Sequence, residues 1–501
     1  MANLDQLPTE LLEIIFQQLE CFDLCALACV NRDLNLSSLQ YLFDRNRILN
    51  STQSSITITG SPTSPISAKE NTAIIQGLLL AVTFPFSPKH LSCTLHSSPS
   101  QFVRDLERLQ RLVEKINSLE EIELDFQHGL KTGIRWEHTS SRGSTIPIRD
   151  LLDAIAFKCS CQKLTLLNGQ ISPGIRLPRI DPPWMVFGWQ GRRMNNLVGT
   201  LVGFGRRFWS PNFTLSFDAT KHSNLRVLNI HSQFLFHFAF IDCAFKLLTS
   251  HSIEILSLRD TKTNTDAWFA ILPHIHLPNL KELYFNNTPM DREDVTTFLT
   301  RHRSLVKLDF GYFGSSMVTT DIGPPWFFLP NVTTLGANPE FLGFFLRGRT
   351  SLSNLRELVI NMRIHTIHQF YFAGMLSKIE HKLKLLDITV RISLENGSAP
   401  QWLPLLGEEN VRFPRWSRRV KKVIIEIVLS RFLNGEEETD IFVVWLRRFQ
   451  EAEILEIQAH DEERDEGKMK TLAQRLRQDL NLNIRTLQLN DEAKLLEEWD
   501  K

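Results

Sequence analysis

Apolar residues recur in a fixed order along most of this chain: one apolar residue, two others, a second apolar residue, one other, and a third apolar residue. Leu228, Asn229 and Ile230 illustrate the last three positions. A polar residue between two apolar ones predicts a short strand that buries one face. Copies of the pattern begin at residues 119, 161, 225, 253, 280, 305, 332, 355, 383, 420, 452 and 484.

The spacing of these copies predicts a repeat. From residue 225 to residue 383 the steps are 28, 27, 25, 27, 23 and 28 residues, and steps of 42, 64, 37 and 32 occur outside this run. Segments of helical character fill the intervals, for example 291–302 and 370–381. The last stretch, 490–501, is expected to be an amphipathic helix that closes the array. In such an array each unit buries its strand against its neighbours.

The pattern resembles a leucine-rich-repeat array. The resemblance implies an α/β fold: a solenoid with one parallel strand and one helix per repeat. We expect an irregular solenoid over residues 71–501, clearest between 223 and 395, because the spacing varies and the family's usual polar residue after each strand, often Asn, is replaced. The residues at that position are Gln233, Thr261, Thr288, Phe313 and Arg363.

The first fifty residues predict three short helices. Pro8 and Thr9 suit a helix start, and apolar residues at 11, 12, 15, 16 and 19 follow the helical period. Asp23 is expected to cap the second helix. The third helix carries Leu36, Leu39, Leu42 and Phe43. Since so small a helical core rarely stands alone, periodicity by itself also allows a helical cap on the next domain.

The order of residues in these helices points to a family. The chain reads Leu-Pro-Thr-Glu-Leu-Leu from Leu7, then Ile-Phe from Ile15, then Asp-Leu-Cys-Ala-Leu-Ala-Cys-Val-Asn-Arg from Asp23. This order resembles an F-box over about residues 4–48. The resemblance implies a short all-α docking domain, residues 1–50, that binds the Skp-type adaptor of a cullin–RING ubiquitin ligase.

The resemblance also nominates contact residues. It implies that the Leu-Pro turn and the apolar face supply most of the contact with the adaptor. Some of the matching residues must instead hold the three helices together, and the sequence does not separate the two roles. The candidate adaptor-binding residues are Leu7, Pro8, Leu11, Ile15, Leu24, Leu27 and Val30.

Two segments lie outside the regular pattern. Residues 51–70 are rich in Ser, Thr and Pro and are expected to form a linker or a long loop. An insert near 170–220 contains Trp184, Trp189, Trp209 and several arginines. Such a stretch suits either an acidic or phosphorylated segment of a client protein, or packing of the aromatic rings on the array with the arginines in water.

Composition excludes several classes of protein. The chain has 56 basic and 56 acidic residues, so no net charge favours nucleic acid or an acidic membrane. The sequence predicts no signal peptide and no membrane-spanning segment. Seven cysteines, an odd number without a disulfide-like framework, fit a reducing compartment. We therefore expect a cytoplasmic or nuclear protein.

No common catalytic or cofactor motif is present in the sequence. Phosphate-binding loops, dinucleotide fingerprints, nucleophile elbows and paired-histidine zinc motifs are all missing. Cys21, Cys25 and Cys29 are spaced by four but lack a fourth ligand, so they are expected to be structural, as are Cys159 and Cys161. We expect no catalytic residue, no metal and no cofactor.

The polar positions within the repeat strands nominate a surface for a client. They alternate with buried positions and so point away from the core. Their mixture of charges and hydrogen-bonding groups suits a specific polar interface with a protein. The candidate client-binding residues are His231, Arg259, Tyr284, Asn286, Lys307, Asp309, Glu357, Asn361 and Asp387.

Together these features predict the substrate receptor of an SCF-type (Skp–cullin–F-box) ubiquitin ligase, with the adaptor at the amino-terminal helices and the client on the repeats. A scaffold protein that binds the adaptor without cullin is the alternative. An enzyme with an unrecognised site in the repeats is a third hypothesis.

Overall fold

The chain divides into two compact units, residues 1–253 and 254–501. Both the insert near 170–220 and the interval 370–381 lie outside the residues that can be described. The computed structural model describes residues 7–46, 55–58, 65–81, 88–95, 99–116, 118–126, 145–169, 223–236, 241–259, 272–286, 292–311, 329–338, 352–363, 387–393, 420–427, 436–447, 449–459, 466–479, 482–489 and 492–495, with a few single residues between them.

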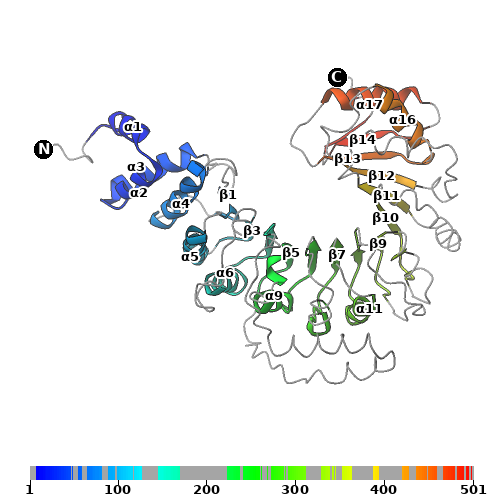
Figure 1. The fold of residues 1–501 in the computed structure, drawn as a ribbon, viewed down its shortest axis with the longest axis horizontal. Coiled ribbons are helices and arrows are strands. Elements are labelled where there is room, and N and C mark those ends of the chain that lie inside the picture. The colour runs from blue at the N-terminus through cyan, green and yellow to red at the C-terminus, as the bar shows by residue number, and fades with distance from the viewer. Residues whose placement is uncertain are drawn as a thin grey trace, which may run out of the picture. The chain divides into compact units, whose positions relative to one another are not determined.

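Three short helices open the first unit, as predicted (Figure 1). Their bounds are α1 Thr9–Gln18, α2 Cys21–Leu27 and α3 Arg32–Arg45. Asp23 is not the cap of α2 but its third residue, because the helix begins two residues earlier. The backbone N–H of Glu20 donates to the Asp23 carboxylate at 3.2 Å, which forms a capping box at the start of α2.

The stretch 51–70, expected to be a linker or loop, contains regular structure. Strand β1, Ser55–Ile58, and the start of helix α4, Pro65–Leu80, both lie in it. Ile56 and Ile58 are fully buried, and β1 pairs in parallel with the next strand. The Ser- and Thr-rich composition concealed the strand, because only these two apolar residues mark it.

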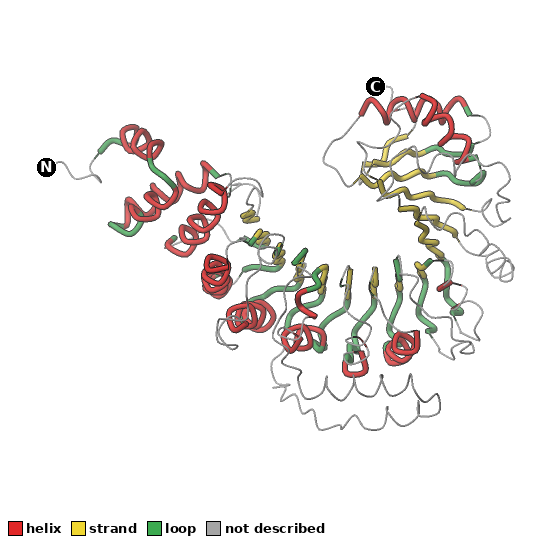
Figure 2. Tube along the Cα trace, in the orientation of Figure 1, coloured by secondary structure: helices red, strands yellow, loops and turns green. Residues whose placement is uncertain are grey.

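The first unit continues as a parallel sheet. Its strands lie side by side in chain order from β1 to β5, with helices at the sheet's flank (Figure 2). The remaining strands of this unit are β2 His90–Thr94, β3 Glu121–Asp125, β4 Lys163–Leu167 and β5 Val227–His231. The helical segments after α4 are α5 Pro99–Lys115, α6 Thr145–Phe157, η2 Phe234–Phe236 and α9 Ile241–Leu248.

The second unit carries a longer run of strands. Successive strands from β6 to β14 pair in parallel, and β15 pairs antiparallel with β14. The strands are β6 Ile255–Arg259, β7 Glu282–Asn286, β8 Lys307–Asp309, β9 Thr334–Ala337, β10 Glu357–Arg363, β11 Asp387–Ser393, β12 Val420–Ile427, β13 Ile454–Ala459, β14 Thr486–Leu489 and β15 Glu492–Leu495. The helical segments are η3 Leu272–His274, α11 Arg292–Arg301, α16 Glu436–Leu446 and α17 Glu466–Gln478.

The apolar pattern described above coincides with these strands. Every copy from residue 119 onward falls on a strand between β3 and β14, and its apolar residues within the strands are buried, which supports a mixed α/β, solenoid-like repeat. One copy is displaced: Ile388 lies opposite Leu358, so the repeat at 383 is shifted by two residues. The parity of inward and outward positions is unchanged because the shift is even.

Threonine occupies two of the positions after the strands at which a leucine-rich repeat would usually have asparagine. Thr261 and Thr288 are fully buried. The hydroxyl of Thr261 donates to that of Thr288 at 3.2 Å, and Thr288 donates in turn to the carbonyl oxygen of Leu258. These hydrogen bonds therefore link the positions that follow β6 and β7.

The carboxyl end of the chain differs from expectation. Residues 490–501 were expected to form a closing helix, but Glu492–Leu495 forms strand β15. It pairs antiparallel with β14, with Glu492 opposite Leu489. Because β15 pairs with the last parallel strand, it covers the backbone edge that this strand would otherwise expose.

Candidate partner-binding surfaces

Helix α1 presents an apolar face to solvent. Leu11 is 46% exposed, Pro8 is exposed, and Leu7 and Ile15 are half-buried. The opposite side of the helix packs inward through Leu12 and Phe16, which are buried. Four of the residues predicted to bind the adaptor thus lie where a partner can reach them.

The remaining predicted adaptor contacts differ in burial. Val30 is 67% exposed and Leu27 is half-buried, but Leu24 is 0% exposed. Leu24 lies inside the helical core because α2 turns that side toward the rest of the unit. Its full burial indicates packing within the helical core, in contrast to the exposed Leu11 and Val30.

Three exposed apolar residues were missed by sequence reasoning. They are Ile14, Phe22 and Leu36, with exposures of 56%, 38% and 66%. Ile14 adjoins the apolar stripe of α1, so its position and apolar character could have nominated it as an adaptor contact. Among the described residues, eight large apolar side chains are exposed, and five of them lie between positions 11 and 36. Such a concentration of exposed apolar groups makes this segment a candidate binding region.

The residues predicted to bind a client all lie on strands, but in two separate units. His231 ends β5 in the first unit, and the other eight belong to the second unit. Arg259 and Asp387 are exposed, whereas Asn361 is fully buried. The rest are half-buried, as expected for side chains that stand between neighbouring strands.

Asp309 on β8 forms hydrogen bonds to two further strands instead of facing solvent alone. Its carboxylate accepts from Asn361 Nδ2 at 2.9 Å, from Arg391 at 3.2 Å and from the backbone N–H of Gly311 at 2.8 Å. It reaches β10 and β11 across Gly336, where a Cβ atom would lie 2.6 Å from Asp309 Oδ1. Asp309 and Asn361, both predicted client contacts, thus hold the strand face together.

Tyr284 forms a second polar group on this face. Its hydroxyl donates to Glu282 at 2.5 Å, and Lys307 Nζ lies 5.3 Å from its ring centre. Partial burial and the Glu282 carboxylate raise the pKa of Tyr284, so the phenol stays protonated. A tyrosine held in place by neighbours loses little side-chain entropy on binding, which suits an interface anchor.

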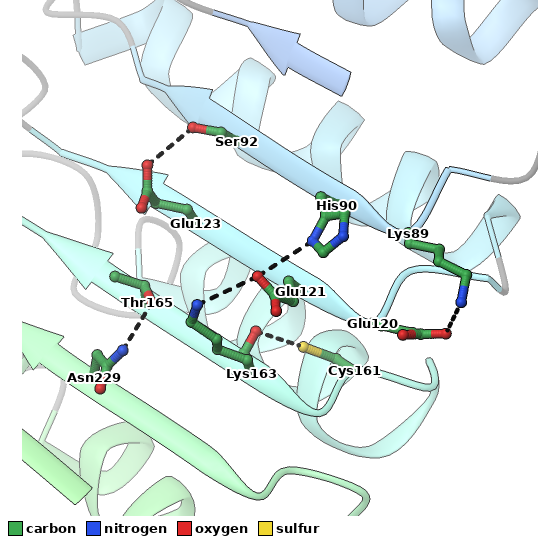
Figure 3. Close-up of polar contacts among 10 residues, drawn as sticks. All are labelled: Lys89, His90, Ser92, Glu120, Glu121, Glu123, Cys161, Lys163, Thr165 and Asn229. Carbon is green, nitrogen blue, oxygen red and sulfur yellow. Dashed lines mark hydrogen bonds and ion pairs between the residues drawn. The ribbon is translucent and has the colours of Figure 1, made fainter. Parts of the chain in front are cut away.

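The strand face of the first unit carries a polar network that the sequence reasoning did not nominate (Figure 3). Glu121 accepts from Lys163 at 3.3 Å and lies 3.2 Å from His90. Glu123 accepts from the Ser92 hydroxyl at 3.0 Å. Both glutamates occupy outward positions of β3, in the copy of the apolar pattern that begins at residue 119, so the same alternation identifies them.

Six of the seven cysteines are buried, and Cys29 is exposed. Cys25 Sγ donates to the carbonyl oxygen of Ala73 at 3.2 Å, and burial raises the pKa of the Cys25 thiol to about 12. Within the described ranges, no three His, Cys, Asp or Glu side chains are grouped as a metal site would require. In the same ranges no helix has the length and apolarity needed to cross a membrane.

Comparison with known families identifies the amino-terminal helices. The F-box domain family matches residues 4–39, which include α1, α2 and the first half of α3. F-box domains generally bind Skp-type adaptors of cullin–RING ligases and are generally non-catalytic receptors. A search of curated proteins found no match to this chain.

Proposed function

We propose that this chain is the substrate receptor of an SCF-type ubiquitin ligase. The F-box helices bind the Skp-type adaptor, and the strand face of the repeats binds a protein client. The observation that supports this most is the concentration of exposed apolar side chains between positions 11 and 36 on the domain that matches the F-box family. The ligase supplies catalysis by holding the client near the charged conjugating enzyme, so this chain needs no catalytic residue.

The adaptor-binding residues follow from exposure. We assign the contact to Leu7, Pro8, Leu11, Ile15, Leu27 and Val30, with Ile14, Phe22 and Leu36 added. Burial of such side chains against a partner contributes roughly 1.5–3 kcal/mol for each fully covered leucine. A few of them account for a stable docking interface.

The first experiment measures adaptor binding by the full chain. The double variant Leu7→Ala with Pro8→Ala is expected to lose adaptor pull-down while its circular dichroism spectrum stays unchanged. Undiminished pull-down would refute the contact. Blotting the same pull-down for cullin separates a ligase receptor from a scaffold, because a scaffold brings the adaptor without cullin.

The client surface is assigned to the predicted residues that project from the strands of the second unit and are not fixed by Asp309. Arg259, Lys307, Glu357 and Asp387 supply charges of both signs, and Tyr284 supplies an aromatic group. This mixture suits a folded or extended protein segment with its own mixed charges. We expect Asp309 and Asn361 to affect client binding by stabilising the strand face and not by contacting the client.

The second experiment reverses charges on this surface. Arg259→Glu, Lys307→Glu and Glu357→Lys are combined, and the proteins that co-purify are compared with those of the unaltered chain by mass spectrometry. The control exchanges the charges of an ion pair outside the strands, Lys158→Glu with Glu114→Lys. Glu114 lies on α5, Lys158 directly follows α6, and their side chains pair at 2.6 Å. An unchanged client list in the triple variant, with adaptor binding retained, would argue against the surface.

A further inference from the structure

We propose that helix α4 is part of the adaptor-docking module: it is a fourth helix that completes the core of the three F-box helices and holds their exposed apolar face in its binding form. This inference rests on the proposed adaptor-binding function. It extends the module from residue 50 to residue 81, into the region that the sequence suggested was a linker followed by repeats.

Helix α3 packs closely against Gly77 of α4. A Cβ atom at Gly77 would lie 2.8 Å from Leu42 Cδ2 and 3.3 Å from Leu39 Cδ2, so no larger side chain fits without displacement. Leu42 and Leu39 are 0% and 3% exposed. The two helices therefore meet through a glycine, which brings backbone against side chain as in a close-packed core.

Polar contacts cross the same boundary. Asn35 Nδ2 on α3 donates to the carbonyl oxygen of Ala28 at 2.8 Å, just after α2, and to that of Leu80 at 3.2 Å, the last residue of α4. Asn35 is buried, so this one amide ties the ends of two helices to a third. Cys25 on α2 makes its buried contact with the carbonyl of Ala73, also on α4.

The other side of α4 is anchored as well. The Thr72 hydroxyl donates to the buried Asp105 carboxylate at 3.2 Å, and Lys115 Nζ donates to the carbonyl oxygen of Leu79 at 2.8 Å. Both partners lie on α5, which precedes β3. Helix α4 thus lies between the F-box helices and the first strand–helix units, and all of them belong to one compact unit.

This arrangement divides the surface of the F-box helices between two roles. Leu39, Leu42 and Cys25 face α4, whereas Leu11, Val30 and the other exposed apolar residues remain open to a partner. Loss of α4 would expose a second apolar surface and loosen the helices that carry the first one. Asn35 and Gly77 are positioning residues, because they act on the adaptor through the arrangement of α1–α3.

The test places a bulky side chain at the glycine contact of the full chain. Gly77→Leu is expected to weaken binding of a purified Skp-type adaptor at least tenfold. Hydrogen exchange of residues 9–45 should accelerate, and that of β7 and β10 should stay unchanged. Gln76→Leu is the matched control, since it adds the same side chain one residue away at a half-buried position and should change affinity less than threefold.

A compensating variant distinguishes packing from general damage. Leu42→Ala removes the side chain that meets Gly77, so the double variant Gly77→Leu with Leu42→Ala should bind within threefold of the unaltered chain. Asn35→Ala, a milder change, should weaken binding threefold or more. Normal binding by Gly77→Leu, or an equal loss for Gln76→Leu, would overturn the role of α4. Failure of the unaltered chain to bind the adaptor would instead overturn the proposed function.

Discussion

Leu11 and Leu24 provide a matched test of how the F-box helices divide binding from folding. Both are leucines that resemble F-box contact positions, but Leu11 is 46% exposed and Leu24 is 0% exposed. Full burial of a leucine is worth roughly 1.5–3 kcal/mol, so covering the exposed part of Leu11 contributes about 1 kcal/mol. Leu11→Ala should therefore weaken adaptor binding by roughly three- to tenfold and change the free energy of unfolding by under about 0.5 kcal/mol.

Leu24→Ala should do the reverse. It opens a cavity in the helical core and is expected to destabilise the first unit by roughly 2–5 kcal/mol. Its adaptor affinity should fall only as far as the folded fraction falls. Urea unfolding followed by circular dichroism gives the stabilities, and calorimetric titration of the adaptor gives the affinities. Equal affinity losses for the two variants at full folded population would refute the division.

Three further predictions test the structure away from the adaptor surface. Burial lowers the pKa of His302 from 6.5 to about 4, so the unfolded state takes up a proton first as pH falls. In urea unfolding, the free energy of unfolding should therefore fall by up to about 3 kcal/mol between pH 6.5 and 4. The variant His302→Gln should not show this loss. Gly336→Ala should displace Asp309 and cost roughly 1–3 kcal/mol in the same assay, and an unchanged midpoint would contradict that contact. Lys115→Met should lower the melting temperature by leaving carbonyl groups of α4 without their donor, whereas Lys158→Met, at an exposed ion pair, should not.

The strands were predictable because their information is local. Successive side chains of a strand point to opposite faces. An apolar residue on each side of a polar one, as Leu228 and Ile230 flank Asn229, therefore identifies the buried and the exposed face without further information. Strands β1 and β2 were missed because Ser, Thr, Pro and Cys surround their few apolar residues, and β15 was missed because Glu492–Leu495 has the composition of a helix. In these places the pairing with a neighbouring strand overrides local preference.

The candidate surfaces were predictable in position but not in role. The alternation placed Asp309 and Lys307 on the outward side of β8, and both lie there. It did not reveal that Asp309 crosses Gly336 to reach Asn361, since those residues are joined only when three successive strands stack in register. Asp309, a predicted client contact, therefore also stabilises the strand face.

The amino-acid order alone was enough to predict F-box helices followed by a repeat of strands and helices, because a family motif and a hydrophobic period are properties of neighbouring residues. Which F-box side chains face outward and which face inward could be read only from the folded chain. Leu24 and Val30 occupy the same apolar pattern, yet one is covered and the other exposed, because burial depends on what packs against a helix. The contact between Gly77 and Leu42 joins helices that strand β1 separates in the sequence. Such contacts cannot be predicted from the pattern of neighbouring residues.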